Sequence, residues 1–325
     1  MNKDKLVVFF SSNCDEQVKQ EFRHELHIET AALSDKYLGL PTVIGRSSTE
    51  AFDFMATRIK NLVGTWSGRE ASCAGHEVLL KSVAQAVPTY SMSCFLLSKT
   101  MCKKMRLTIA NYWWGSSADN RHIHWLRRYR LTQHKSTGGM GFRDLHRFNK
   151  AMLGKQGWRL VTRSNSLCTR VLKGRYYHDG DFMHSTRRKR ASHTWRAILA
   201  GRVVLERGLI RRIGNGKQTN IWRDRWIPAH FDARPITPGD GQALTMVSEL
   251  MTESGVWNEV LIREVFVLID ARAILKIPIR QQDEDWWMWE LEKHGNNSVK
   301  SDYQKLYAMN GRGDEEMSSG SVDDS

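Results

Sequence analysis

Apolar residues recur at intervals of three or four positions through the first half of the chain. Three sets stand out: Phe52, Met55, Ile59 and Leu62; Met101, Met105, Ile109 and Tyr112; and Leu145, Phe148 and Met152. This interval places side chains on one face of an α-helix. A further apolar stretch, residues 77–87, is followed by Pro88, which cannot continue a helix. The pattern therefore predicts four helices, with Ser47 and Glu50 forming a capping box at the start of the first.

Short β elements are predicted between and around these helices. Residues 5–11 (KLVVFFS) are rich in β-branched and aromatic side chains, and residues 37–41 (YLGLP) form a short strand that Pro41 stops. Asn215-Gly216 is a typical hairpin tip, so a second strand is expected over residues 219–222. The fold class predicted from the sequence is mainly α with small β elements.

The net charge of +14 is distributed unevenly. Residues 1–100 hold 11 Lys/Arg and 11 Asp/Glu, residues 101–228 hold 29 against 6, and residues 229–325 hold 9 against 18. A segment with a net charge of +23 concentrates positive potential and attracts polyanions, chiefly nucleic acid. An amphipathic helix on a membrane surface is the competing interpretation, but here the cations spread over more than one helix.

The kinds of residue in the basic segment bear on how it would bind. Of its 29 cations 21 are Arg, which pairs with phosphate in a bidentate manner and stacks on bases. Seven of the twelve tryptophans lie there as well: Trp113, Trp114, Trp125, Trp158, Trp195, Trp222 and Trp226. Such residues suit stacking on unpaired bases, or they are core residues.

Two groups of cations are candidate phosphate contacts. Arg143, Arg147 and Lys150 fall at i, i+4 and i+7 of the fourth predicted helix and would form one basic stripe. A solvated helix face is the alternative. The second group is Arg187, Arg188, Lys189 and Arg190, which is also similar to a nuclear-localisation patch.

No catalytic or metal-binding motif is evident. The sequence contains no Tyr-x-Asp-Asp, the paired-aspartate signal of a reverse transcriptase. The densest acidic cluster is residues 283–285, and the His pairs at 24/27 and 122/124 lack companions at ligand spacing. Gly138-Gly139-Met140-Gly141 is not a dinucleotide fingerprint, because Asp144 stands at the third glycine position. We therefore expect no cofactor and no metal.

The five cysteines and the hydropathy bear on the compartment. No two cysteines form a C-x-x-C pair, which favours reduced intracellular thiols over a disulfide framework. No run of about 18 apolar residues is present, so no membrane span is expected. A nuclear or a mitochondrial location is compatible with these features.

Many phrases of the sequence occur in the order and spacing of one known family. They are residues 37–41 (YLGLP), 45–47 (GRS), 74–90 (AGHEVLLKSVAQAVPTY), 112–115 (YWWG), 123–125 (IHW), 138–145 (GGMGFRDL), 148–156 (FNKAMLGKQ), 212–216 (RIGNG) and 221–226 (IWRDRW). The chain resembles, over roughly residues 1–305, the plant LINE-type (non-LTR) retrotransposon reverse transcriptases.

The resemblance implies a division into four parts. Residues 1–45 would be a palm remnant, 46–165 a helical thumb-like region, 166–240 a basic connector with one hairpin, and 241–325 the truncated start of a zinc-binding module with a disordered tail. Lys5 matches the lysine of the motif that closes the palm. Tyr37, Leu38 and Gly39 resemble the primer-grip hairpin. A thumb follows the phosphates of the template–primer duplex, which implies binding without sequence preference.

The departures from the family limit the implied activity. The fingers and the catalytic aspartates, expected before Met1, are not in the sequence, and neither is the Cys/His cluster expected after Tyr303. The resemblance therefore implies a catalytically incomplete piece of an RNA-directed DNA polymerase that retains binding to RNA or DNA. A host nucleic-acid-binding module without polymerase activity is the alternative. An unrelated hydrolase or transferase would need a convergent acid–base pair that the sequence does not reveal.

Overall fold

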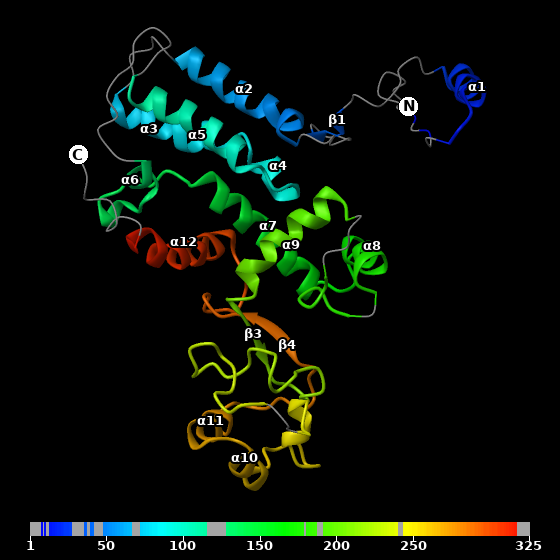
Figure 1. Cartoon of the computed structure of the whole chain (residues 1–325), viewed down its shortest axis with the longest axis vertical. Coiled ribbons are helices and arrows are strands. Elements are labelled where there is room, and N and C mark those ends of the chain that lie inside the picture. The colour runs from blue at the N-terminus through cyan, green and yellow to red at the C-terminus, as the bar shows by residue number, and fades with distance from the viewer. Residues whose placement is uncertain are drawn as a thin grey trace. The chain divides into compact units, whose positions relative to one another are not determined.

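A computed structural model of the chain separates into two compact units. The first comprises Met1–Ser91 and Leu97–His146, and the second comprises Met92–Leu96 and Arg147–Ser325. Each is described by itself (Figure 1). The structure describes residues 8, 10, 13–27, 36–37, 40–41, 48–66, 72–115, 128–178, 180–186, 191–239 and 243–316. The predicted strand at residues 5–11 and the capping residue Ser47 lie largely or wholly outside these ranges.

Helices dominate the described part of the chain. They are α1 (Glu16–Leu26), α2 (Ser48–Trp66), α3 (Cys73–Ser82), η2 (Ala84–Ala86), α4 (Thr89–Cys94), α5 (Lys99–Trp113), α6 (Arg128–Thr132), η3 (Lys135–Thr137), α7 (Leu145–Thr162), α8 (Leu167–Tyr176), α9 (His193–Leu205), η4 (Val247–Leu250), α10 (Glu259–Val265), α11 (Leu268–Ile274) and α12 (Val299–Glu316). The strands β1 (Lys36–Tyr37), β2 (Leu40–Pro41), β3 (Leu209–Arg212) and β4 (Trp286–Trp289) form two antiparallel pairs. The predicted fold class, mainly α with small β elements, is confirmed.

The core of the first unit lies between α2 and α5, which run side by side (Figure 1). Phe52, Met55 and Ile59 of α2 are buried, as are Met101 and Met105 of α5. These are residues that the helical spacing selected. Helix α3 departs from its predicted bounds, because the Ser72 hydroxyl accepts the Gly75 N–H and starts the helix at Cys73. It ends at Ser82, and η2 continues the chain toward Pro88.

Strands β1 and β2 form a hairpin where one strand ending at Pro41 was predicted. Tyr37 pairs with Leu40 and Lys36 with Pro41 in antiparallel register. Pro41 is compatible with this position because, among the strands that the structure describes, β2 pairs with β1 alone and Pro41 needs to donate to no second strand. The assignment of Tyr37, Leu38 and Gly39 to a primer grip stays a prediction, because Leu38 and Gly39 lie outside the described residues.

In the second unit, α7 and α9 approach each other closely at glycines. A Cβ atom on Gly201 of α9 would lie 2.4 Å from the carbonyl carbon of Leu153 and 2.5 Å from the amide nitrogen of Gly154 in α7. Around this crossing lie the buried side chains of Trp158, Trp195 and Trp289. The α7–α9 crossing therefore positions α8, which follows α7 directly, and β3, which follows α9.

A second core of the same unit lies beyond β3 and contains the helices α10 and α11. Ile221, Trp226, Ile262 and Ile274 are its central buried residues. The hairpin prediction required β3 to pair with residues 219–222, and in the structure it does not. It pairs with β4, with Leu209 opposite Trp289 and Arg212 opposite Trp286. The hairpin predicted at Asn215-Gly216 is therefore wrong.

The reason lies in the carboxylate of Asp285, which is buried. Its Oδ1 accepts the N–H groups of Gly214 at 2.7 Å and Gly216 at 2.9 Å. Its Oδ2 accepts the Gln218 N–H at 3.0 Å and the Thr219 hydroxyl at 2.7 Å. Gly216 has φ +72°, a conformation that favours glycine. The loop wraps around a carboxylate, so Asp285 serves the fold and both of its oxygens are occupied.

Candidate nucleic-acid interface

Helix α8 contacts the rest of the second unit through one side only. The Ser166 hydroxyl caps it by accepting the Thr169 N–H at 3.2 Å. The Thr169 hydroxyl donates to the Arg163 carbonyl at 2.8 Å, which ties the first turn of α8 to the end of α7. At the other end the buried Tyr176 ring stacks on Trp195, with ring centroids 4.7 Å apart and planes 6° from parallel. These contacts hold the helix in place through residues that point toward the core.

The remaining side of α8 and the end of α7 carry exposed cations. We call the following residues the α7–α8 cations: Arg159, Arg163, Arg170, Lys173 and Arg175. Among the residues that the structure describes, none of them pairs with a carboxylate, and α8 itself contains no acidic residue. Arg175 lies over the Tyr176 ring at 5.7 Å. The helix also exposes Leu167 and Val171, at 74% and 59% of their surface. The α7–α8 cations are thus positioned to contact phosphates without first breaking an ion pair.

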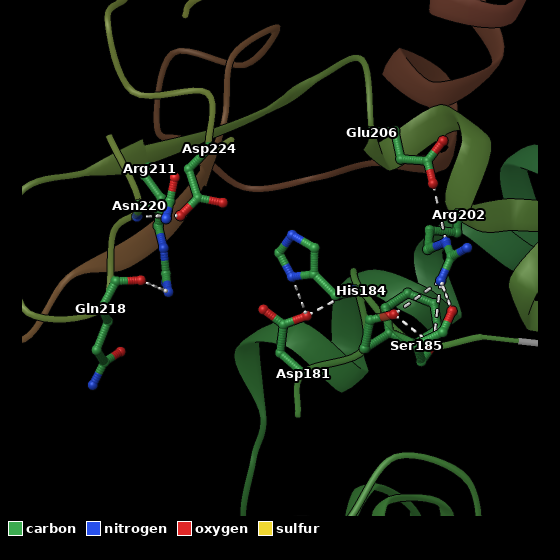
Figure 2. Close-up of polar contacts among 10 residues, drawn as sticks. Asp181, His184, Ser185, Arg202, Glu206, Arg211, Gln218, Asn220 and Asp224 are labelled. Carbon is green, nitrogen blue, oxygen red and sulfur yellow. Dashed lines mark hydrogen bonds and ion pairs between the residues drawn. The ribbon is translucent and has the colours of Figure 1, made fainter. Parts of the chain in front are cut away.

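Other arginines of the basic segment are used by the fold itself. In Figure 2 the Arg202 guanidinium donates to the Ser185 carbonyl at 2.6 Å and pairs with Glu206 at 3.0 Å. Arg211 is buried, donates to the Gln218 carbonyl at 3.0 Å and lies 4.4 Å over the Trp287 ring. Burial lowers the pKa of its guanidinium. Such cations add to the net charge of the segment but are not available to a ligand.

The predicted stripe of Arg143, Arg147 and Lys150 does not lie along one helix. Helix α7 begins at Leu145, after Arg143, which belongs to the first unit and is exposed. Arg147 is half-buried and its guanidinium lies 4.9 Å from the centre of the Tyr307 ring. Lys150 is half-buried as well. Helix α7 is covered on more than one side, since Asn149, Ala151 and Leu153 are fully buried. A role of the three cations in binding stays a prediction.

The other predicted binding residues fall mostly outside the described residues. This holds for Lys5, Leu38, Gly39 and the group Arg187, Arg188, Lys189 and Arg190. Of Tyr37 the structure describes the backbone, which pairs with Leu40. Their proposed roles in binding stay predictions.

The tryptophans of the basic segment are mainly core residues. Trp158, Trp195 and Trp226 are buried, and the half-buried Trp222 stacks on Phe266 at 5.4 Å and donates its Nε1–H to the Leu244 carbonyl. Trp113 and Trp114 are half-buried, and Trp125 lies outside the described residues. The core interpretation is therefore right for the buried three, and none of them offers a free ring face to a base.

The described residues contain no group of three or more His, Cys, Asp or Glu that could hold a metal ion. The rings of His24 and His27 lie 6.5 Å apart at the end of α1, and His122 and His124 lie outside the described residues. No described helix combines the length and the apolar character that crossing a bilayer requires.

Sequence reasoning missed the α7–α8 cations as a candidate site, although a signal was available. Residues 167–176 (LCTRVLKGRY) contain three cations, no carboxylate, and only a weak helical pattern of apolar residues. A short helix of this kind cannot bury itself on several sides, so its cations stay exposed. The regular i, i+4, i+7 spacing of Arg143, Arg147 and Lys150 was the more conspicuous pattern and the less informative one.

Two plant proteins are similar to this chain. The protein named Uncharacterized mitochondrial protein AtMg00310, of Arabidopsis thaliana, is 42% identical over 154 residues, which are 47% of this chain and 98% of that protein. The protein named Putative ribonuclease H protein At1g65750, of the same plant, is 28% identical over 280 residues, or 82% of this chain. The chain spans only 44% of that longer protein. No protein-family model matches the chain.

Proposed function

The chain belongs to the family of the Arabidopsis thaliana mitochondrial protein AtMg00310, and we propose that it is a nucleic-acid-binding part of a plant retrotransposon reverse transcriptase. Its role would be to hold RNA or DNA by the phosphates, without sequence preference and without polymerase chemistry. The single observation that carries the proposal is the group of α7–α8 cations, exposed and without a carboxylate partner among the described residues.

Four further observations support this proposal. Residues 101–228 carry a net charge of +23, which favours a polyanionic partner. The phrases between residues 37 and 226 resemble plant LINE-type reverse transcriptases in order and spacing. The longer of the two similar proteins is named Putative ribonuclease H protein, which favours a nucleic acid as the partner. The hairpin of β1 and β2 has the place in the chain that the primer-grip resemblance requires.

A second candidate function is a host nucleic-acid-binding module that works without polymerase activity. The coverage of the mitochondrial relative favours it, because 154 residues similar to this chain make up 98% of that protein. The flanking genomic DNA separates the two candidates. An upstream reading frame for a palm domain, broken by stops, supports a decayed element, whereas a clean gene structure supports a retained module.

Salt titration of binding tests the proposed function. Each phosphate that is neutralised on duplex DNA releases counterions, so log K falls with log salt at a slope of roughly −0.9 per contact. About six contacts would lower the affinity roughly a thousandfold between about 50 and 200 mM salt. Fluorescence anisotropy with labelled duplexes of unrelated sequence measures this slope. A slope near zero, or affinity for one sequence that ignores salt, contradicts the proposal.

Polymerase activity is expected to be absent from this chain. The sequence has no paired aspartates of the Tyr-x-Asp-Asp kind to hold the metal ions that activate a primer hydroxyl. Purified protein should therefore not extend a primed RNA template with magnesium and nucleotides. Templated extension that stays with the protein through gel filtration would contradict this expectation.

A further inference from the structure

The second unit contains an open cavity of about 280 Å³ beside β3. Its apolar walls come from Met183, Leu209 and Trp287, and its polar groups come from His184, Glu206, Arg223, Asp224, Arg225 and Arg234. Its volume lies just below the usual range for ligand sites, roughly 300 to 1,000 Å³. Such a cavity accommodates one nucleotide-sized group rather than a duplex.

Two guanidinium groups at this cavity have unused donors. The Arg223 side chain is exposed and makes no hydrogen bond or ion pair with another described residue. Arg234 donates its Nε–H to the Arg223 carbonyl at 2.9 Å and its Nη1 to Asp232, which leaves Nη2 unused. That hydrogen bond ties the Arg234 side chain to the backbone of Arg223. Both arginines line the cavity, so both guanidinium groups can donate to a phosphodiester there.

Two buried charged residues line the cavity, Asp224 with 7% of the residue exposed and Arg225 with 6%. One oxygen of Asp224, Oδ2, accepts the Asn220 N–H at 2.7 Å, and Oδ1 has no hydrogen bond to a described residue. His184 lies near it, with its Nδ1 bonded to Asp181 at 3.0 Å. Figure 2 shows the other ring nitrogen of His184 pointing away from Asp181. The cavity thus presents the carboxylate oxygen Oδ1 of Asp224 as a hydrogen-bond acceptor.

We propose that this cavity receives one unpaired nucleotide of a bound single strand, and that Asp224 accepts a hydrogen bond from the exocyclic amino group of its base. The inference rests on the proposed function and deepens it. Cytosine, adenine and guanine carry such an amino group, and a carboxylate is its natural acceptor, as in Asp contacts to cytosine N4. Thymine and uracil present a carbonyl oxygen there instead. The Arg223 and Arg234 donors then take the phosphate, and Trp287 lines the base.

The same geometry argues against a free anion as the ligand. A phosphate ion would fit the arginines, but it carries only negative charge, which the Asp224 carboxylate at the same cavity repels. Inorganic phosphate should therefore compete with a short oligonucleotide no better than an equal ionic strength of chloride does. Competition by phosphate at low concentration would identify an anion site and overturn the nucleotide assignment.

The experiment compares labelled single-stranded oligo-dC and oligo-dT of equal length by fluorescence anisotropy at matched salt. The full chain should bind oligo-dC about fivefold more tightly, the contribution of one modest base contact. In Asp224→Asn the amide can keep an oxygen for Asn220 and turn its NH₂ toward the base, which suits thymine. The ratio of the two affinities should then fall to about one or invert.

A second variant is needed if the circular dichroism spectrum shows that Asp224→Asn is unfolded. Arg223→Gln removes an exposed guanidinium at the cavity and should weaken both oligonucleotides more than Arg272→Gln, an exposed arginine of α11 that does not line it. Equal affinity of the unmodified chain for both oligonucleotides, or equal effects of the two Arg variants, overturns the inference. If salt-dependent binding persists in that case, the proposed function stands; if no oligonucleotide binds, the proposed function itself fails.

Discussion

The arginines of α8 and those around β3 come from the same basic segment but have different roles. Arg170 and Arg175 of α8 are exposed and have no carboxylate partner among the described residues. Arg225, which follows β3, is buried and donates to the carbonyls of Leu209 at 3.0 Å and Asp232 at 2.9 Å. A net charge counts both kinds alike. The comparison shows that only the first kind is available to a polyanion, and that the second kind holds the fold together.

The largest effect on stability is expected when a structural arginine is removed, which tests the distinction between structural and available arginines. Arg225→Gln deprives the Leu209 and Asp232 carbonyls of a charged donor and leaves Glu290 without its partner at 3.3 Å. The free energy of unfolding should fall by about 4 kcal/mol, since hydrogen bonds to charged groups contribute about 1.5 to 3 kcal/mol each. Urea denaturation measures this change.

The control for that variant is the neighbouring Arg223, whose guanidinium is exposed and without a described partner. Arg223→Gln should change the free energy of unfolding by less than about 0.5 kcal/mol. If both variants lower stability equally, the distinction between structural and available arginines is wrong.

Two helical glycines sharpen the same comparison between a packed helix and an exposed one. Gly201→Ala should lower the free energy of unfolding by about 3 kcal/mol, because the added methyl meets the backbone of Leu153 and Gly154 in α7. Gly174→Ala in α8 meets nothing within 4 Å and should raise it by roughly 0.5 to 1 kcal/mol. Thermal and urea denaturation of the pair measure both signs. A destabilising Gly174→Ala would mean that α8 is not exposed as described.

Asp302 carries a buried carboxyl group. The dependence of the free energy of unfolding on pH tests whether burial raises the pKa of this group. Asp302 lies in α12 beside Lys155 of α7, accepts a hydrogen bond from Asn297, and its Oδ2 is buried without a described partner. Burial raises the pKa of this carboxyl from 3.8 to about 7. The folded state therefore keeps a proton that the unfolded chain has already lost between about pH 4 and 7.

Its contribution to the free energy of unfolding should accordingly decline as pH rises from about 4 to 7, by about 4 kcal/mol, and then level off. Asp302→Asn keeps an oxygen for Asn297 and should flatten that part of the profile. Asp283→Asn, at an exposed carboxylate, is the matched control and should leave the profile unchanged. If the free energy of unfolding rises with pH through this range in the unmodified chain and not in Asp302→Asn, the raised pKa of Asp302 is contradicted.

The helical part of the fold could be predicted because its signal is local. Phe52, Met55 and Ile59 are close in sequence and share one helix face, so spacing alone placed them in a core. The β3–β4 pairing could not be predicted in this way, because Arg211 and Asp285, which meet in the structure, are 74 residues apart. The Asn215-Gly216 turn has the local chemistry of a hairpin, but the distant carboxylate of Asp285 determines its conformation.

The candidate site was predictable in charge and not in position. Composition alone identified the basic segment and its preference for a polyanion. It could not tell that Arg147 lies against Tyr307 or that Arg202 is bonded to Ser185, since both facts depend on contacts between distant parts of the chain. Exposure separates the α7–α8 cations from these residues, and exposure is a property of the folded molecule.

The measurement that tests the central claim most directly is the salt slope of binding in two charge-matched triple variants. One changes Arg170, Lys173 and Arg175 of α8 to Gln, and the other changes the exposed Arg272, Lys276 and Lys293, which lie in the acidic segment, to Gln. Both lose three positive charges, and both should unfold at the urea concentration of the parent chain. The α8 variant should show a slope less steep by up to about 2.7, roughly 0.9 per lost contact on duplex, with every sequence weakened alike. Equal slopes in the two variants would contradict the claim that the α7–α8 cations bind the nucleic acid.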